Sequence, residues 1–216
     1  CWLANALLGV VESHLGRYEQ AQLLFEGALA SNSNILLYGL WLSTFDTQRR
    51  LQTAKIEKLL LRALWTDPDR LLDTPPRAPL ALHWFYGQAL EGLQFAVNAS
   101  SKGVSYAQKK YVQWLMGLNP FLPSSESREN VARELSKEDE PLSQVLYAYL
   151  LKEMRKYEDA SRVLARTIQL VDFDQIRSSW PWTLAGNIFE ERSVSDQAIF
   201  YYQNALSRNP RDINAM

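Results

Sequence analysis

Residues that could perform chemistry are few in this sequence and lie far apart. The chain of 216 residues has one cysteine, Cys1, and two histidines, His14 and His83. One cysteine excludes an intramolecular disulfide framework and a cysteine-rich metal site. Both histidines fall in helical patterns, where a surface or packed histidine is far commoner than a catalytic base. We therefore predict no catalytic residue, no metal site and no cofactor.

The adjacent carboxylates Glu190 and Glu191 could be taken for a catalytic dyad. Neighbouring residues on a helix point about 100° apart, so we expect both groups to be solvated charges on a groove or surface. The sequence also contains no glycine-rich phosphate loop, no nucleophile elbow and no HExxH zinc motif. It therefore favours a protein that is not an enzyme.

A basic cluster at Arg49, Lys55, Lys58 and Arg62 could contact phosphates. The last three residues share one helix face at positions i, i+3 and i+7. An exposed basic face balanced by Glu57 explains the same residues, and we favour that alternative. The net charge of −1 provides no overall field that would attract nucleic acid. We therefore expect no direct binding of nucleic acid.

A repeated pattern of small and aromatic residues indicates which elements carry these side chains. Near the end of the chain it comprises Trp182, Ala185, Gly186, Phe189, Ala198, Tyr202, Ala205 and Pro210. Near the start, Leu8, Gly9, Ala21, Phe25 and Ala28 occur in the same register. The pattern resembles that of the tetratricopeptide repeat (TPR), W-x2-L-G-x2-Y followed by A-x3-F and P, in which each repeat is a pair of helices. Further copies contain Ala63, Leu64 and Pro68, and Tyr157, Ala160 and Leu164.

Packing explains the small residues of this pattern. We expect Ala21, Ala160 and Ala198 where the two helices of a hairpin cross, because only a small side chain lets the backbones approach. The glycines of the pattern serve the same close approach, and the aromatic rings fill the space beside it. These roles are structural.

The repeats predict an all-α fold, a right-handed superhelical α-solenoid of helix–turn–helix units. Proline clusters at 75–79 and 120–123 interrupt it. We expect two TPR-like repeats in residues 1–70 and a degenerate repeat with proline-rich flanks in 71–124. A linker helix and two further repeats are expected in 125–216. Because neither end carries a polar capping unit, we expect the solenoid to continue beyond both.

In TPR arrays the first helix of each pair lines a concave groove that binds other proteins. The resemblance places these residues on the groove: Tyr38, Trp41, Phe45, Trp84, Tyr149 and Asn187. Aromatic residues at the spacing of Tyr38, Trp41 and Phe45 are more often core, and that alternative stays open. If the rings are exposed, a partner should cover them, because an exposed aromatic patch promotes aggregation.

The resemblance implies a non-catalytic scaffold that binds proteins through its concave groove and convex flank. The first quarter of the chain also resembles the large TPR scaffold of the superkiller (Ski) complex of cytoplasmic RNA decay, most specifically at Cys1-Trp2-Leu3 and Gly39-Leu40-Trp41. Two other functions fit the sequence. One is the docking arm of an enzyme whose catalytic domain lies outside residues 1–216, and the other is a TPR lipoprotein of a bacterial envelope.

The expected cellular location depends on which of these functional alternatives holds. No apolar run approaches the ~20 residues that span a bilayer, so we expect no membrane span. Cys1 stands directly before a helical pattern, whereas a lipid anchor is normally followed by a polar spacer. We therefore favour an internal fragment of a cytoplasmic protein over a periplasmic lipoprotein in which Cys1 carries the lipid.

Overall fold

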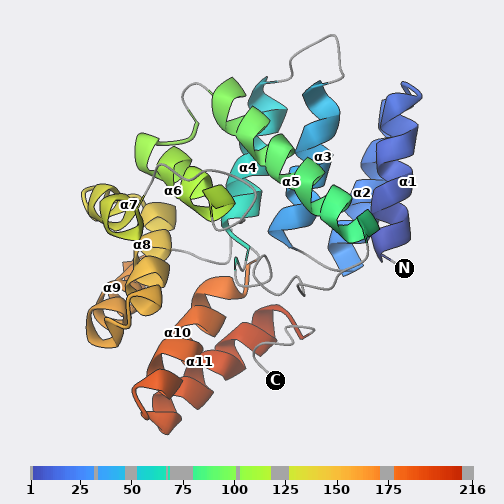
Figure 1. The fold of residues 1–216 in the computed structure, drawn as a ribbon. Coiled ribbons are helices and arrows are strands. Elements are labelled where there is room, and N and C mark those ends of the chain that lie inside the picture. Colours follow the sequence, from blue (N-terminus) through green and yellow to red (C-terminus); the bar gives the residue numbers. More distant parts are fainter. Residues whose placement is uncertain are drawn as a thin grey trace. The chain divides into compact units, whose positions relative to one another are not determined.

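The computed structural model describes residues 2–31, 34–46, 53–66, 68, 80–100, 103–117, 127–170 and 178–210, and every regular element in these ranges is a helix (Figure 1). The helices divide between two compact units, Cys1–Ser124 and Ser125–Met216, and each unit is considered by itself. The all-α fold built from helical hairpins that the sequence predicts is confirmed.

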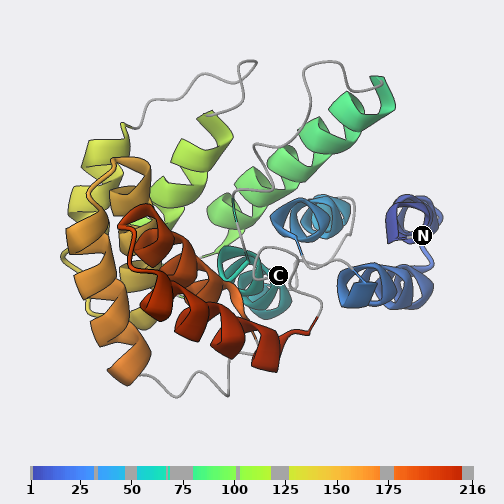
Figure 2. The same cartoon turned by 90° about the horizontal axis from the view of Figure 1, so that it is seen from below.

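Unit 1 is a stack of helices that begins with an antiparallel hairpin. It contains α1 (Trp2–His14), α2 (Tyr18–Ser31), α3 (Ile35–Asp46), α4 (Thr53–Leu64), α5 (Leu80–Ala99) and α6 (Tyr106–Gly117). Helix α3 is contacted by α1, α2, α4 and α5 and so occupies the middle of the unit. Helix α1 lies at the edge of the unit (Figure 2).

Unit 2 contains a short helix followed by two hairpins. Its elements are α7 (Arg128–Leu135), α8 (Pro141–Glu153), α9 (Tyr157–Leu170), α10 (Trp180–Glu191) and α11 (Ser195–Arg208). Side-chain caps begin the first two helices, since Ser127 accepts from the Asn130 amide and Glu140 accepts from the Ser143 amide. Helix α8 packs against α7, α9 and α10.

Three hairpins close through the same turn, in which the chain leaves the first helix in the left-handed conformation. The left-handed residues are Gly16 (φ 77°), Arg155 (φ 58°) and Ser193 (φ 59°). In each turn the next residue donates its amide to a carbonyl five positions earlier, as Val194 does to Phe189 at 2.9 Å. This hydrogen bond satisfies one of the last carbonyl groups of the first helix. The hairpins α1–α2, α8–α9 and α10–α11 are therefore copies of one structural unit.

The helix crossings lie where the repeat pattern predicts them. Ala21, Ala160 and Ala198 are all buried. A Cβ added at Gly9 would lie 3.0 Å from the Phe25 ring, and one at Gly186 would overlap the Tyr202 ring. The glycines thus let an aromatic side chain of the second helix lie directly on the backbone of the first. This part of the prediction is confirmed.

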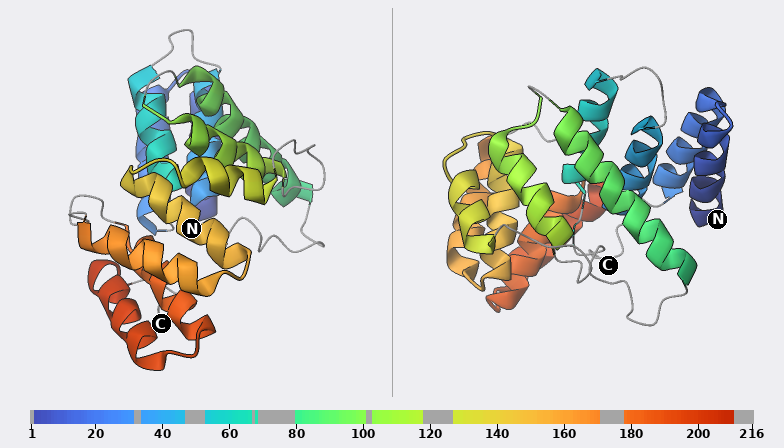
Figure 3. Two further views of the ribbon diagram at one scale, coloured as in Figure 1. Left: turned by 90° about the vertical axis from the view of Figure 1, so that its left-hand side faces the viewer. Right: turned by 45° about the horizontal axis from the view of Figure 1, so that its top comes forward.

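One close helix approach among the described residues of unit 1 is absent from the repeat pattern. Helix α5 crosses α3 (Figure 3), and Gly39 and Gly92 lie at the crossing. A Cβ on Gly92 would overlap the Gly39 carbonyl oxygen and the Ser43 amide nitrogen. Backbone therefore lies on backbone here, which only glycine permits. This contact fixes α5 on the middle helix of the unit.

Candidate functional site

Two predicted groove residues, Trp41 and Phe45, are packed inside unit 1. Their side chains are 5% and 3% exposed, and the Trp41 ring stacks on Phe25 of α2 with a centroid distance of 5.5 Å. The physical reason is that α3 is covered by four other helices. The alternative that the sequence favours for this spacing, that these rings belong to the core, therefore describes Trp41 and Phe45. Tyr38, on the same helix, is half-buried.

Lys55 of α4 covers the same two rings. Its Nζ lies 5.8 Å from the Trp41 centroid and 5.6 Å from the Phe45 centroid, and it donates to Gln22 Oε1 at 2.6 Å. An ammonium over aromatic faces is attracted by their π electrons. Lys55 is therefore engaged within unit 1 itself.

The rest of the basic cluster is only partly described. Lys58 and Arg62 are exposed on α4, one turn apart. Arg49 lies outside the described residues. A pair of exposed cations on one helix is typical of a solvated surface, so the structure offers no assembled phosphate site among the described members of the cluster.

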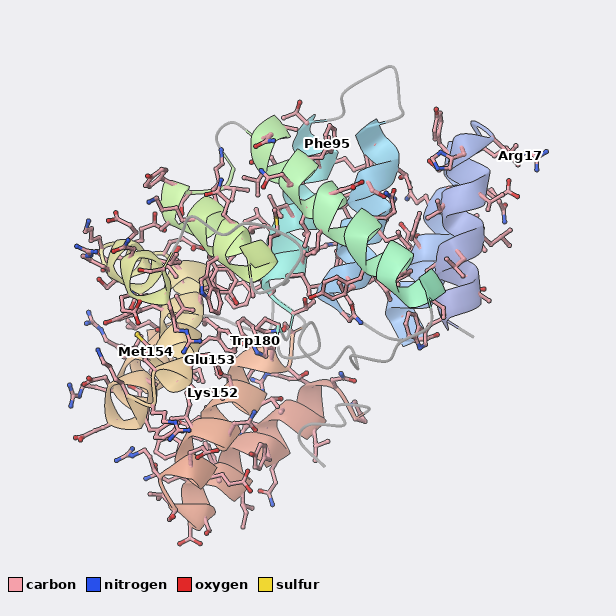
Figure 4. All side chains as sticks on the ribbon, viewed as in Figure 1. Arg17, Phe95, Lys152, Glu153, Met154 and Trp180 are labelled. Carbon is pink, nitrogen blue, oxygen red and sulfur yellow. The ribbon has the colours of Figure 1, made fainter. Side chains whose placement is uncertain are left out.

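Tyr149 and Trp84 are the predicted groove residues of the middle repeats. Trp84 lies on α5, but its side chain is outside the described residues. Tyr149 of α8 is 0% exposed, and its ring centroid lies 6.1 Å from that of Trp180 at the start of α10. Lys152, labelled with Trp180 in Figure 4, has its Nζ 5.4 Å above the Tyr149 ring and pairs with Glu153 at 3.2 Å. Because α7, α9 and α10 surround α8, Tyr149 is also core, and its groove assignment is corrected.

Asn187, the last predicted groove residue, belongs to a polar cluster at the surface of unit 2. The Tyr202 hydroxyl lies 2.7 Å from Glu190 Oε2 and 2.8 Å from Asn187 Oδ1, so its single proton can be donated to either acceptor. Asn187 and Tyr202 are half-buried, whereas Glu190 and Glu191 are exposed. We call Asn187, Glu190, Glu191 and Tyr202 the polar edge of unit 2.

The electrostatics of the polar edge keep the Tyr202 phenol protonated. Burial raises the pKa of Tyr202 above its ordinary value of 10.0, and the hydrogen bond to Glu190 and the charges of Glu190 and Glu191 raise it further. A neutral phenol at physiological pH is a hydrogen-bond donor that holds the Glu190 carboxylate in place. The edge thus presents acceptor oxygens at fixed positions.

The hairpin geometry explains why Asn187, Glu190 and Tyr202 meet. Gly186 lets the Tyr202 ring lie on α10, so the hydroxyl extends over the next turn of that helix. Asn187 follows Gly186 directly and Glu190 lies one turn later, on the same side. Sequence reasoning identified Asn187 and both carboxylates but treated Tyr202 only as a filler of space. The available signal was a tyrosine at the register position that Phe25 occupies in the first hairpin.

The described residues contain neither a metal site nor a membrane span. No group of three or more His, Cys, Asp or Glu side chains in these ranges could hold a metal ion. None of the described helices combines the length and the apolar character that crossing a bilayer requires.

Comparisons with known proteins add little to what the repeats in the sequence indicate about the fold. No protein-family model matches the chain, and no curated protein matches it. Among solved structures, it is similar to the crystal structure of a thermophilic TPR protein of Thermus thermophilus. That alignment has 17% identity and a TM-score of 0.32, and it covers 100% of this chain and 95% of the other. So low a score carries no argument.

Proposed function

We propose that this chain is a non-catalytic TPR-type scaffold that binds a protein partner along the polar edge of unit 2. The observation that carries this proposal is the exposed Glu190, held beside Asn187 by the Tyr202 hydroxyl, with the exposed Glu191 next to it in the sequence. A carboxylate held by a neutral donor accepts hydrogen bonds but does not form a nucleophile–base pair. The arrangement supports recognition rather than catalysis.

The partner that fits this edge is a segment with lysine or arginine side chains. Exposed carboxylates attract cationic groups and determine which partners are excluded. Asn187 and Glu190 lie on α10 and contact Tyr202 of α11, so little conformational entropy is lost when a ligand binds to them. The two carboxylates on neighbouring helix positions can each accept from a different residue of the segment.

Charge reversal at the polar edge tests this function. The double variant Glu190→Arg, Glu191→Arg should lose the proteins that co-purify with the wild-type chain, measured by quantitative mass spectrometry of an affinity purification from the source cell. The matched control is Glu158→Arg, Asp159→Arg on α9, because these residues are also adjacent, acidic and exposed. Both doubles change the net charge by the same amount.

The two variants separate recognition from nonspecific charge attraction. We expect the α9 variant to retain the wild-type set of partners. If the two doubles lose the same proteins to the same extent, net charge is the cause and the polar edge is not the binding site. If neither double loses a partner, the polar edge has no role in binding.

The finer assignment within this proposal is the Ski-type assembly of cytoplasmic RNA decay. It is supported by the resemblance of the first quarter of the chain, part of which is also explained by packing, since Gly39 lies at the α3–α5 crossing and Trp41 is core. This assignment predicts stable co-purification with a helicase. Absence of a helicase from the purified set would exclude that assembly without affecting the test of the polar edge.

A further inference from the structure

The Tyr202 hydroxyl stands between two acceptors of the polar edge but has one proton to give. It lies 2.7 Å from Glu190 Oε2 and 2.8 Å from Asn187 Oδ1. A hydrogen bond to an ionised acceptor is roughly twice as strong as one between neutral groups, so the proton goes to Glu190. The phenol oxygen then faces the Asn187 side chain with its lone pairs.

The Asn187 amide can satisfy these lone pairs with its nitrogen. The oxygen and the nitrogen of a carboxamide exchange places when the group turns over, and the neighbouring hydrogen bonds decide which of them faces a partner. An amide oxygen beside the phenol oxygen would leave two acceptors in contact with no proton between them, whereas Nδ2 donates. The result is one chain of hydrogen bonds, from Asn187 Nδ2 to the Tyr202 oxygen and from the Tyr202 hydroxyl to Glu190 Oε2, in which each bond strengthens the other.

Turning the amide changes what the polar edge presents to a partner. With Nδ2 toward Tyr202, Oδ1 of Asn187 points away from the phenol. Glu190 follows Asn187 by three positions, so the two side chains are neighbours on one side of α10. Glu190 is exposed and Asn187 is half-buried. A neutral acceptor oxygen and a carboxylate therefore lie side by side.

Helix α9 shows how this chain satisfies a comparable pair of acceptors. Glu158 and Asp159 are adjacent and exposed, and the guanidinium of Arg162 bridges them, at 3.5 Å from Glu158 and 3.3 Å from Asp159. Arg162 follows Glu158 by four positions, whereas the residue four positions after Glu190 is Val194. Helix α10 therefore has no arginine at the bridging position.

The cation that follows the two carboxylates in the sequence is used elsewhere. Arg192 donates to Ser161 Oγ of α9 at 2.8 Å, and its Cζ lies 5.4 Å from the ring centroid of Phe189. Arg192 thus ties the last hairpin to α9. The acceptors of the polar edge are left to a cation of the partner.

We propose that the polar edge selects arginine over lysine in its partner, and that Asn187, with its amide nitrogen turned to Tyr202, makes the selection. This inference rests on the function proposed above. A guanidinium carries its donors in a planar fork, so one group can bridge Asn187 Oδ1 and Glu190 Oε1 as Arg162 bridges two side chains of α9. An ammonium is a compact, strongly hydrated charge and engages Glu190 alone.

Two small probes test the selection. They are N-acetylarginine N-methylamide and N-acetyllysine N-methylamide, titrated into the isotopically labelled full chain while NMR follows the amide shifts of α10. The arginine probe should bind about 5-fold more tightly, the equivalent of one additional hydrogen bond. Asn187→Ala should abolish this preference by weakening the arginine probe alone. The matched control is Gln197→Ala at an exposed amide of α11, which should leave the preference unchanged.

A double-mutant cycle tests the orientation of the amide. Asn187→Asp replaces Nδ2 by a charged oxygen, and its effect on the unfolding equilibrium constant is compared in the wild type and in Tyr202→Phe. If Nδ2 donates to the phenol, the substitution should raise this constant about 5-fold more where the phenol is present. The repulsion between the introduced carboxylate and Glu190 is common to both backgrounds and cancels in the comparison.

The opposite outcomes are equally defined. A smaller cost of Asn187→Asp in the presence of the phenol would mean that Oδ1 accepts the proton, and it would overturn the orientation. Equal affinities of the two probes, or no shift on α10 with either, would overturn the selection of arginine. Neither result alters the co-purification test of the proposed function, because charge reversal at Glu190 and Glu191 repels a lysine and an arginine alike.

Discussion

The first and last described hairpins share a register but differ in the chemistry of one ring. Sixteen residues separate Gly9 from Phe25 and Gly186 from Tyr202, and in both hairpins the ring lies on the glycine. Phe25 is fully buried against Trp41 of the neighbouring helix. Tyr202 is half-buried, and its hydroxyl reaches polar groups on α10.

This difference separates what the repeat requires from what it permits. Both hairpins need a small residue under a flat ring, because that contact closes the two helices. Closure of the hairpin does not restrict which chemical group stands at the far end of the ring. Where another helix covers it, phenylalanine is suitable, and where the ring end meets the surface, a hydroxyl can organise carboxylates for recognition.

Replacing the crossing alanines has the largest expected effect and tests the shared register. Ala198→Trp and Ala21→Trp should each lower the free energy of unfolding by ~3 kcal/mol or more, since overpacking typically costs ~1–3 kcal/mol and the backbones are close here. Chemical denaturation followed by circular dichroism measures the loss. Ile199→Trp is the control, because Ile199 is exposed and its replacement should cost less than about 0.5 kcal/mol. Equal losses for Ala198→Trp and Ile199→Trp would show that the register is misassigned.

Exchanging the rings tests the difference between the hairpins. Phe25→Tyr should lower the free energy of unfolding by ~1–3 kcal/mol, because its hydroxyl enters a contact with Gly9 and Trp41. Tyr202→Phe should lower it by only ~1 kcal/mol, since the lost hydrogen bonds lie at the surface. The same denaturation experiment compares the two. A larger loss for Tyr202→Phe than for Phe25→Tyr would contradict the assignment of core and edge.

The pH dependence of stability should also distinguish the two rings. The pKa of Tyr202 is raised in the folded state above its ordinary 10.0, so the folded chain holds this proton more tightly than the unfolded chain. Its contribution to stability is complete below pH 10 and is lost as the pH rises through the folded pKa. Urea denaturation between neutral pH and alkaline pH should show a shallower decline for Tyr202→Phe than for the wild type. Identical declines would mean that the phenol is not coupled to folding.

The smallest expected effect comes from the turns that the hairpins share. Ser193 adopts the left-handed conformation that Gly16 adopts in the first hairpin, and a side chain is strained there. Ser193→Gly should raise the free energy of unfolding by about 0.5–1 kcal/mol, the relief of strain being partly offset by the flexibility of glycine when unfolded. Gly16→Ala should have the opposite sign. A shift of the melting temperature in the same direction for both variants would contradict the equivalence of the turns.

Local pattern was sufficient to predict the helices and the hairpin crossings. Ala21 and Ala198 could be placed because a small residue recurs at a fixed distance from an aromatic one. Each of these inferences depends on residues within one hairpin. The structure buries both residues as expected.

Contacts between hairpins could not be predicted in the same way. The crossing of Gly39 with Gly92 joins residues that belong to different repeats, and no local period relates them. The burial of Trp41 and Phe45 follows from the helices that cover α3 from other sides, which a spacing of i, i+4 on one helix does not reveal. Lys55 is a further example, because its place over those rings depends on the packing of α4 against α3.

The glycine crossing of α3 and α5 also has a consequence for the speed of folding. The turns of unit 2's hairpins join helices that are consecutive in the chain, so each hairpin can close early with a small loss of chain entropy. Gly39 and Gly92 must meet across an intervening stretch of about fifty residues, and closing so long a loop is entropically slower. The step that sets the folding time of unit 1 should therefore be the arrival of α5 on α3.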